Sequence, residues 1–223
     1  MLSHAQTHLL IEGARILGSQ LSSKELVCFS LYLEEIARWS KIADLVSQTD
    51  PAIIIRKHIL DSLAILPLLP PATRLLDLGS GAGFPGLVLA ILRPSLQVFL
   101  LEARRKRANF LKDASRKMRL ANVAVYEGRA EVLCEEEPLK ASFDFVITRA
   151  TWGLEDFLRL AEPFLVANGL AVALKGPQAE QDIPALEPRL RKGGFCLKEQ
   201  HAYLLPYGEE KRQALFFAKR CFT

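Results

Sequence analysis

The first part of the chain has the hydrophobic spacing of helices. Over the first ~70 residues, apolar positions recur every three or four residues, which places them on one helical face. They include Leu26, Phe29, Leu33, Ile36, Ile54, Ile55, Ile59, Leu63 and Leu66. Asp50 followed by Pro51 fits an N-cap with proline at the first helical position. The pattern predicts a helical region over residues 1–70.

After Pro67, Pro70 and Pro71 the pattern changes to short apolar runs that alternate with amphipathic stretches of helical length. The runs predict strands near Arg74–Leu78, Gln97–Glu102, Asn122–Glu127, Phe143–Thr148 and Leu170–Lys175. The stretches between them predict helices over about Pro85–Leu92, Arg104–Leu120 and Leu154–Val166. Strands that are apolar on both faces and separated by helices indicate a parallel sheet covered on both sides. Residues 71–223 are therefore predicted to form a doubly wound α/β domain.

The last part of the chain carries two strand-like runs that directly follow one another. Phe195–Leu205 and Gln213–Arg220 are joined by a short segment that contains Pro206 and Gly208. Such a connection is typical of an antiparallel hairpin. The predicted fold is a Rossmann-like α/β fold whose mostly parallel sheet ends in this hairpin.

Composition excludes several classes of protein. Of the 223 residues, 50% are hydrophobic and 24% are charged, as in globular domains. No apolar run approaches the ~20 residues of a membrane-spanning helix, and no basic residue precedes the apolar patch Leu9–Ile11 as in a secretory signal. The four cysteines are widely separated, without a Cys-x-x-Cys pair or a histidine at metal-ligand spacing. We expect a cytoplasmic protein with reduced thiols, no metal site and no membrane contact.

Positive charge is concentrated in one predicted helix. The segment Arg104–Arg119 carries eight basic residues and one acidic residue, Asp113, for a net charge of +7. The whole chain has a formal charge of +4, so the remaining residues sum to −3. A basic patch confined to one element favours a polyanionic partner such as a nucleic acid. A solvated helix face gives the same pattern, and the sequence leaves both interpretations open.

A glycine-rich segment joins the first predicted strand to the helix that follows it. From Asp77 to Gly86 it runs Asp-Leu-Gly-Ser-Gly-Ala-Gly-Phe-Pro-Gly. Glycines let a ligand approach the backbone closely, and ligands of doubly wound folds bind at this edge of the sheet. The spacing Gly81-x-Gly83-x-x-Gly86 also fits the dinucleotide fingerprint, which keeps NAD as an alternative. Asp77 would repel a pyrophosphate but suits the ammonium group of S-adenosylmethionine, so the loop favours that cofactor.

Two further strand ends are placed to complete a nucleoside site. Glu102 ends the second strand, where a carboxylate can accept hydrogen bonds from both ribose hydroxyls, a role common to NAD and S-adenosylmethionine folds. After the third strand, Gly128-Arg129-Ala130-Glu131 offers a backbone amide and an acceptor to an adenine edge. For Glu131 the structural alternative is a carboxylate that stabilises a helix start.

Five motifs follow one another along the chain: Leu76–Gly86, Lys106-Arg107-x-x-Phe110-Leu111, Gly128–Glu131, Arg149-Ala150 and Ala173–Gly176. In this order they resemble the RsmG family, also called GidB, which methylates N7 of a guanosine in bacterial small-subunit ribosomal RNA. Upstream, Lys57-His58-Ile59-Leu60-Asp61-Ser62 is similar to the family's Arg-His-x-x-Asp-Ser motif, with lysine in place of arginine. The resemblance spans about Trp39 to Lys219.

The sequence departs from the family pattern in two places. Asp44-Leu45-Val46 stands where the family has Asn-Leu-Thr, and Glu210-Lys211-Arg212-Gln213 stands where the family has Glu-Arg-His. The resemblance implies a class I methyltransferase fold, S-adenosylmethionine as cofactor, and 16S ribosomal RNA or the assembled small subunit as substrate and partner. A monomer is expected.

Candidate site residues follow from the loop, the strand ends and the family motifs. The candidate cofactor-binding residues are Asp77, Gly79, Gly81, Gly83, Phe84, Glu102, Ala130, Glu131 and Arg149. The candidate RNA-binding residues are Lys57, His58, Arg129, Lys175, Lys211 and Arg212.

The residues at the predicted end of the fourth strand limit the kinds of methyl transfer that the site can perform. Thr148-Arg149-Ala150-Thr151 lacks both the Asn/Asp-Pro-Pro-aromatic motif of amino-group methyltransferases and a nucleophilic cysteine. Guanine N7 has a free lone pair and no proton to remove, so positioning suffices and no general base is required. Arg149 is the catalytic candidate, because a guanidinium can hold a carboxylate, a phosphate or guanine O6. A structural ion pair is the alternative for Arg149, and a helix pairing with Asp61 is the alternative for His58.

Three other functions stay open at this point. They are an NAD-dependent oxidoreductase, a methyltransferase that acts on a small molecule, and a non-catalytic RNA-binding protein that retains the cofactor fold. Binding of S-adenosylhomocysteine or of NADH separates the first of these from the rest.

Overall fold

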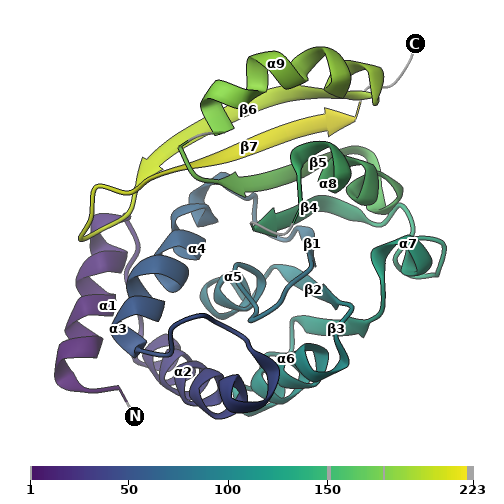
Figure 1. Cartoon of the computed structure of the whole chain (residues 1–223). Coiled ribbons are helices and arrows are strands. Elements are labelled where there is room, and N and C mark those ends of the chain that lie inside the picture. The colour runs from purple at the N-terminus through teal and green to yellow at the C-terminus, as the bar shows by residue number, and fades with distance from the viewer. Residues whose placement is uncertain (1, 150–151, 178, 220–223) are drawn as a thin grey trace.

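The structure, a computed structural model, describes residues 2–149, 152–177 and 179–219. The strands form a seven-stranded sheet in the order β3-β2-β1-β4-β5-β7-β6 (Figure 1). The strands are β1 (Arg74–Leu78), β2 (Gln97–Glu102), β3 (Val123–Glu127), β4 (Phe143–Arg149), β5 (Leu165–Lys175), β6 (Phe195–Leu204) and β7 (Lys211–Lys219). Neighbours among β1 to β5 are parallel, whereas β7 is antiparallel to both β5 and β6. The predicted parallel sheet with a C-terminal hairpin is confirmed.

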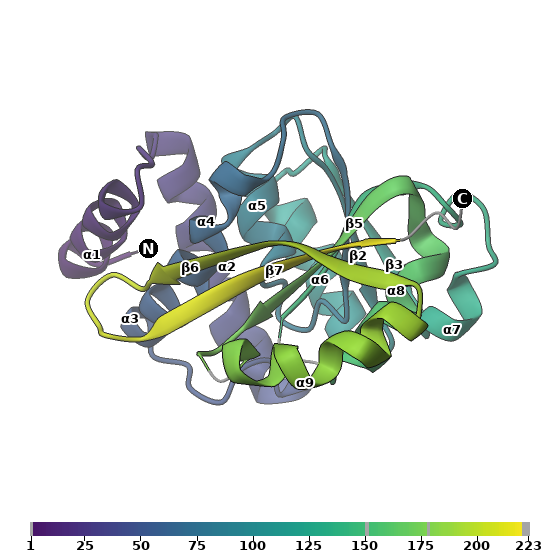
Figure 2. The same cartoon turned by 90° about the horizontal axis from the view of Figure 1, so that it is seen from above.

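Helices cover both faces of the sheet (Figures 1 and 2). One side holds α1 (His4–Ile16), α2 (Ser23–Ala43), α3 (Pro51–Ile54), α4 (Leu60–Ala64), α5 (Gly86–Leu92) and α6 (Arg105–Lys117). The other side holds α7 (Ala130–Leu133), α8 (Leu154–Ala161) and α9 (Ala179–Lys192). Because successive strand residues point to opposite faces, Leu75 and Ile147 join one hydrophobic cluster while Leu76 and Val146 join the other.

The N-terminal helices belong to the same core as one face of the sheet. Leu10, Phe29 and Tyr32 are completely buried in the cluster that also contains Leu75 and Leu87. Both long helices begin with a capping box, at Ser3 for α1 and at Ser22 for α2. A domain boundary at residue 70 therefore stays a prediction, although the change from helices to alternating strands and helices does fall there.

The segment between α8 and β5 was predicted incorrectly. The expected helix Leu154–Val166 ends at Ala161, a 3₁₀ turn covers Glu162–Phe164, and β5 already begins at Leu165. Pro163 explains the early end, since a proline has no N–H for the helical ladder and restricts the residue before it.

Helix α9 was not predicted at all. It spans Ala179–Lys192 and contains Pro184 and Pro188, which obscure the helical pattern in the sequence. The hairpin that follows reaches back to the N-terminal helices, because the Tyr207 hydroxyl donates to the Leu9 carbonyl at 3.0 Å. Figure 1 shows this turn beside α1.

The described residues contain no helix that is long and apolar enough to cross a membrane. Cys28 and Cys134 are buried, Cys196 is half-buried, and all three are free thiols. Cys221 lies outside the described residues.

Candidate active site

The glycine loop between β1 and α5 lies at the C-terminal edge of the parallel strands. Gly79, Gly81 and Gly83 have φ angles of 71°, 56° and 87°, a left-handed region that glycine adopts at little cost. A Cβ on Gly83 would lie 2.5 Å from the Leu87 side chain, whereas a Cβ on Gly81 would meet nothing nearer than the Gly79 carbonyl at 3.8 Å. The loop is packed at Gly83 and open at Gly81, as a ligand cradle requires.

Buried polar groups hold this loop. Asp77 is 1% exposed, and its Oδ2 accepts a hydrogen bond from the Gly86 N–H at 2.9 Å. Burial raises the pKa of Asp77 to about 7, although the Gly86 N–H and Arg149 favour the charged form. The hydroxyl of Tyr32 in α2 donates to the Ala82 carbonyl. Asp77 thus fixes the start of α5, and its contact with a ligand ammonium group stays a prediction.

Glu102 links the loop to the start of α6. Its Oε2 accepts from the Gly81 N–H at 2.9 Å, and its Oε1 accepts from the Arg104 N–H at 2.8 Å. An ionised carboxylate has about four lone-pair sites, so each oxygen retains capacity for a ribose hydroxyl. These acceptors fit the nucleoside that the sequence predicted.

A first cavity of about 320 Å³ lies beside Glu102, within the size range of small-molecule sites. We call it the cofactor cavity. Its lining includes Gly79, Leu101, Glu102, Ala103, Arg104, Arg107, Gly128, Arg129, Ala130, Glu131 and Trp152. Four predicted cofactor residues, Gly79, Glu102, Ala130 and Glu131, therefore meet in one place. Arg129, predicted as an RNA contact, lies here instead of with the other basic candidates.

Arg149 ends β4 next to the glycine loop. The hydroxyl of Thr148 donates to the Leu78 carbonyl at 3.1 Å, which joins the two strand ends. The Arg149 guanidinium lies 5.0 Å from the ring centre of Phe84 and 3.5 Å from Oδ2 of Asp61. Arg149 therefore forms an ion pair with Asp61, which was the structural alternative for this residue. It also contacts Phe84 of the glycine loop, so the ion pair does not remove it from the site.

The Asp61 carboxylate joins three distant parts of the chain. It is 4% exposed and accepts from the Tyr203 hydroxyl at 2.8 Å, while Arg212 Nε lies 4.0 Å away. Burial raises the pKa of Asp61 above its ordinary value, against the effect of Arg149 and Tyr203. The alternative that His58 pairs with Asp61 is wrong, since the His58 Nδ1 contacts Arg149 Nη1 at 2.9 Å.

A second cavity of about 330 Å³ opens on the other side of Arg149, and we call it the basic cavity. It is lined by Lys57, His58, Asp61, Arg149, Leu174, Lys175, Gly176 and Arg212. The structure thus brings together four of the predicted RNA-binding residues with Arg149. Lys211 is exposed at the start of β7 and does not line the cavity.

Lys57 and His58 lie on an unusual helical turn. Residues Ile55–Ile59 form a π-helical turn between α3 and α4, and such turns occur frequently at functional sites. Ile55 and Ile59 are fully buried while Lys57 is exposed and His58 is half-buried. The anchored turn presents the two polar side chains to the basic cavity.

Helix α6 carries fewer unpaired cations than its charge suggests. Lys117 pairs with the buried Glu35, Lys112 lies 3.6 Å from Glu127, and Arg116 lies 3.0 Å from Asp113. Arg107 donates to the carbonyls of Ala43 and Asp44 at the end of α2. Among the described residues, Arg104, Arg105 and Lys106 have no ion pair, and all three are exposed at the start of the helix.

Some contacts of the site carry no local signal in the sequence. Tyr203 and Asp61 are separated by 142 positions and Tyr32 and Ala82 by 50. Lys175 Nζ donates to the Trp152 carbonyl at 2.8 Å, which links the two cavities. Burial lowers the pKa of Lys175.

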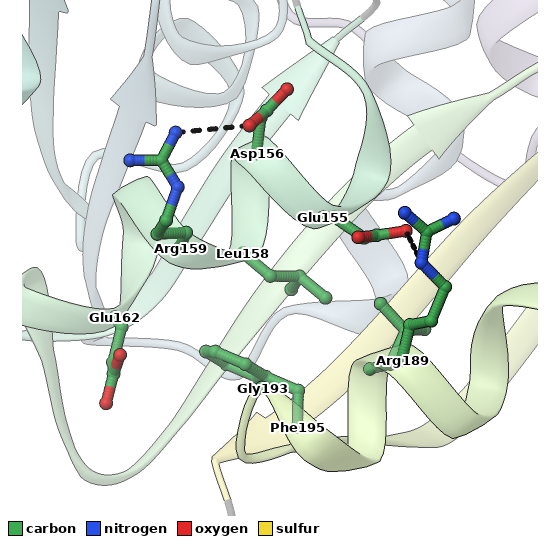
Figure 3. A pocket seen from close by; sticks show the side chains of 9 residues that line it. Glu155, Asp156, Leu158, Arg159, Glu162, Arg189, Gly193 and Phe195 are labelled. Atoms are coloured by element: carbon green, nitrogen blue, oxygen red, sulfur yellow. Dashed lines mark hydrogen bonds and ion pairs between the residues drawn. The ribbon is translucent and has the colours of Figure 1, made fainter.

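A further hollow of about 260 Å³ lies between α8, α9 and the start of β6 (Figure 3). Its rim carries the ion pairs Glu155–Arg189 and Asp156–Arg159, each at 3.1 Å. No predicted site residue lines it. No group of metal-ligating side chains occurs among the described residues.

The fold is that of a Rossmann-like methyltransferase. A SAM dependent methyltransferase from Aquifex aeolicus matches with a TM-score of 0.58, covering 82% of this chain and 98% of that chain at 17% sequence identity. Strand order, glycine loop and the carboxylate at the end of β2 together define this class.

The family follows from closer relatives. The family described as GidB, rRNA small subunit methyltransferase G, matches residues 26–204. The ribosomal RNA small subunit methyltransferase G of Syntrophus aciditrophicus is 34% identical over 95% of this chain and 88% of its own length. The protein of the same name from Methylobacillus flagellatus is 40% identical over 79% of this chain and 84% of its own. The chain belongs to the rRNA small subunit methyltransferase G family, as the motifs predicted.

Proposed function

We propose that this protein transfers the methyl group of S-adenosylmethionine to N7 of a guanosine in 16S ribosomal RNA. One observation carries the proposal: the Arg149 side chain lies between a glycine loop built for a nucleoside ligand and a cavity lined by Lys57, His58, Lys175 and Arg212. The names of the relatives, which act on small-subunit ribosomal RNA, support the same substrate.

The residues around the loop fit the cofactor. Left-handed glycines leave the Gly81 backbone open, Glu102 has lone pairs for a ribose diol, and Asp77 adds a buried carboxyl of a kind that suits an ammonium group. When bound, the cofactor supplies an electrophilic methyl group. Glu102 and the loop would orient the nucleoside.

The other half of the site receives the base. Lys57 and Arg212 are placed to hold RNA phosphates, and Arg149, which contacts His58 and Asp61, to position the side chains that face the base. In the transfer, the N7–carbon bond forms as the sulfur–carbon bond breaks, and the electron pair of that bond stays on sulfur. No proton moves, which agrees with a site whose histidine has a low pKa, about 4, because of burial and nearby cations. Alignment within about 3–3.5 Å is the main contribution of the protein.

The alternatives are less well supported. A dinucleotide-binding sheet has the order 3-2-1-4-5-6 with parallel strands, whereas here the antiparallel β7 is inserted between β5 and β6. A small neutral substrate gives no reason for five cationic or imidazole side chains around one cavity. We propose that the protein acts as a monomer in the cytoplasm, where small subunits are assembled.

The test is labelled methyl transfer to small subunits and to free 16S RNA from cells that lack the gene, followed by mapping of the product. The proposal expects one labelled nucleotide, N7-methylguanosine, in at least one of the two substrates. Label on another base, on another atom of guanine, or on neither substrate contradicts it.

A further inference from the structure

The imidazole of His58 is held in one orientation. Arg149 Nη1 lies 2.9 Å from its Nδ1, and the ring stacks on Phe84 with centroids 5.1 Å apart and an interplanar angle of 28°. The Arg149 guanidinium is itself fixed by Asp61. One face and the Nδ1 edge of the ring are thus held before any substrate binds.

This contact determines the tautomer. A guanidinium has five N–H donors and no acceptor, so the Nδ1 of His58 accepts the hydrogen bond. In a neutral imidazole one nitrogen accepts while the other carries the proton. The proton of His58 therefore lies on Nε2.

His58 stays neutral over the physiological range. Burial lowers its pKa to about 4, with further contributions from Arg149 and Lys57 and from Arg212. These cations come from β4, from its own turn and from β7, while the loop contributes the uncharged Phe84. The ring is therefore a hydrogen-bond donor without a positive charge.

The donor is available to a ligand. His58 lines the basic cavity. Arg149 occupies its Nδ1, so the Nε2–H is the donor that the ring can offer to a ligand. An N–H group in the wall of a substrate cavity needs an acceptor, and the bound substrate can supply it.

We propose that His58, fixed as its Nε2–H tautomer by Arg149, determines base specificity by donating to the carbonyl oxygen O6 of the target guanine. This inference rests on the proposed function. Guanine presents the acceptors N7 and O6 on that edge, whereas adenine presents an amino donor in place of O6. With adenine in the site, the Nε2–H of His58 would face the amino group of the base, and neither donor would have an acceptor.

The absence of charge on His58 suits the reaction. Methylation moves the positive charge from sulfur to the guanine ring, so a cationic donor at O6 would oppose the product. A neutral N–H holds the carbonyl without that repulsion. The Asp61 carboxylate, 3.5 Å from Arg149 Nη1, balances the charge of that guanidinium.

The first test removes each partner of the proposed hydrogen bond in turn. Small subunits are reconstituted with RNA that carries either guanosine or 2-aminopurine riboside at the mapped position; the second base keeps N7 but has hydrogen in place of O6. For the unaltered protein, kcat/KM should fall by about 10- to 100-fold on the 2-aminopurine substrate. For His58→Phe, which keeps an aromatic ring against Phe84, the two substrates should differ by less than about 3-fold. His58→Gln retains an N–H donor and should restore part of the preference.

The outcomes are distinguishable from failure of the proposed function. His8→Phe on the exposed side of α1 is the matched control and should keep the full preference. If guanosine subunits are not methylated at all, the proposed function fails. If they are methylated and His58→Phe discriminates as strongly as the unaltered protein, the specificity role of His58 is overturned.

The second test needs no substrate. Nitrogen NMR of the free protein at pH 7 should show His58 neutral and protonated on Nε2, and Arg149→Leu should allow a mixture of tautomers. A protonated Nδ1 or an imidazolium in the unaltered protein would overturn the inference, whatever the activity of the variants.

Discussion

The cofactor cavity and the basic cavity lie at one edge of the same sheet, yet they are built differently. The first is lined mainly by residues at the ends of three consecutive strands, from Gly79 to Glu131, and its geometry depends on the left-handed glycine loop and its backbone amides. The second combines the π-helical turn, Arg149, Lys175 and β7, and it is held by side-chain ion pairs over long sequence separations. Changes in the first half should affect cofactor affinity, and changes in the second should affect turnover and stability.

The largest effect is expected for Gly81→Val. The φ of 56° is unfavourable for valine, and its methyl groups would point into the open side of the loop. We expect at least about a 100-fold loss of S-adenosylhomocysteine affinity in calorimetry, with the fold retained. Gly18→Val is the matched control, because Gly18 has a φ of 76° and free space around it but lies far from the loop in sequence. Equal affinities of both variants would show that the loop does not hold the cofactor.

The second-largest effect is expected in the basic cavity, where Arg149→Ala should lower turnover. Turnover should fall by about 100-fold or more, because an orienting group is lost, whereas S-adenosylhomocysteine affinity should change little. Asp61 keeps Tyr203 as a partner, so unfolding in urea should show a loss of only about 1–3 kcal/mol. Arg159→Ala, which removes an exposed ion pair on α8, should change neither quantity. Strong destabilisation with normal specific activity would reduce Arg149 to a structural role.

A third prediction compares the two halves through pH. Burial raises the pKa of Asp77 to about 7 and lowers that of His58 to about 4. Folded Asp77 keeps its proton to higher pH than unfolded Asp77, so its contribution to stability falls from about pH 4 to about pH 7. Unfolded His58 takes up a proton below about pH 6.5 while the folded form does so only near pH 4, so its contribution rises over that range.

The two substitutions should therefore give opposite slopes. Relative to the unaltered protein, the unfolding free energy of Asp77→Asn should rise with pH over this window, and that of His58→Phe should fall. Each slope is limited to about 1.4 kcal/mol per pH unit, the value for one proton. Urea unfolding at intervals from pH 4.5 to 7.5 measures both, and slopes of the same sign would contradict the burial of one of the two groups.

The smallest effect is expected for the salt dependence of RNA binding, and it should differ between the start of helix α6 and its later turns. Neutralising Arg104 and Arg105 removes cations without an ion pair, whereas neutralising Lys112 and Arg116 removes cations paired with Glu127 and Asp113. If the start of α6 contacts RNA, the first variant should reduce the log–log salt slope of RNA binding by about 0.7–0.9 per lost contact. The second should reduce it less. Unchanged slopes in both variants would make the whole helix a solvated face.

The difference between the halves also explains what the sequence could predict. The glycine loop, Glu102 and Gly128–Glu131 are local motifs at strand ends, and parallel strands bring such ends together. Their convergence on one cavity was therefore foreseeable. The contact of Tyr203 with Asp61 was not, because it depends on the insertion of β7 between β5 and β6 and on the exact register of the hairpin.

Prolines caused the errors in the predicted helices, and the role of the charges on α6 could not be decided from the sequence. Pro163 ended α8 early and Pro184 and Pro188 concealed α9, although a helix tolerated both of the latter. The net charge of α6 left open a surface for a polyanion and a solvated helix face, and Glu35 on α2 and Glu127 on β3 neutralise part of that charge. Sequence reveals the number of charges on an element but not which acidic groups the fold places beside them.

The central claim is that the loop half of the site binds an S-adenosylmethionine-type ligand independently of the basic half. Calorimetric titration of the unaltered protein and of Arg149→Ala with S-adenosylhomocysteine and with NADH tests it most directly. The account predicts that S-adenosylhomocysteine binds both proteins with similar affinity and that NADH binds neither. Binding of NADH, or a cofactor affinity that collapses in Arg149→Ala, would contradict it.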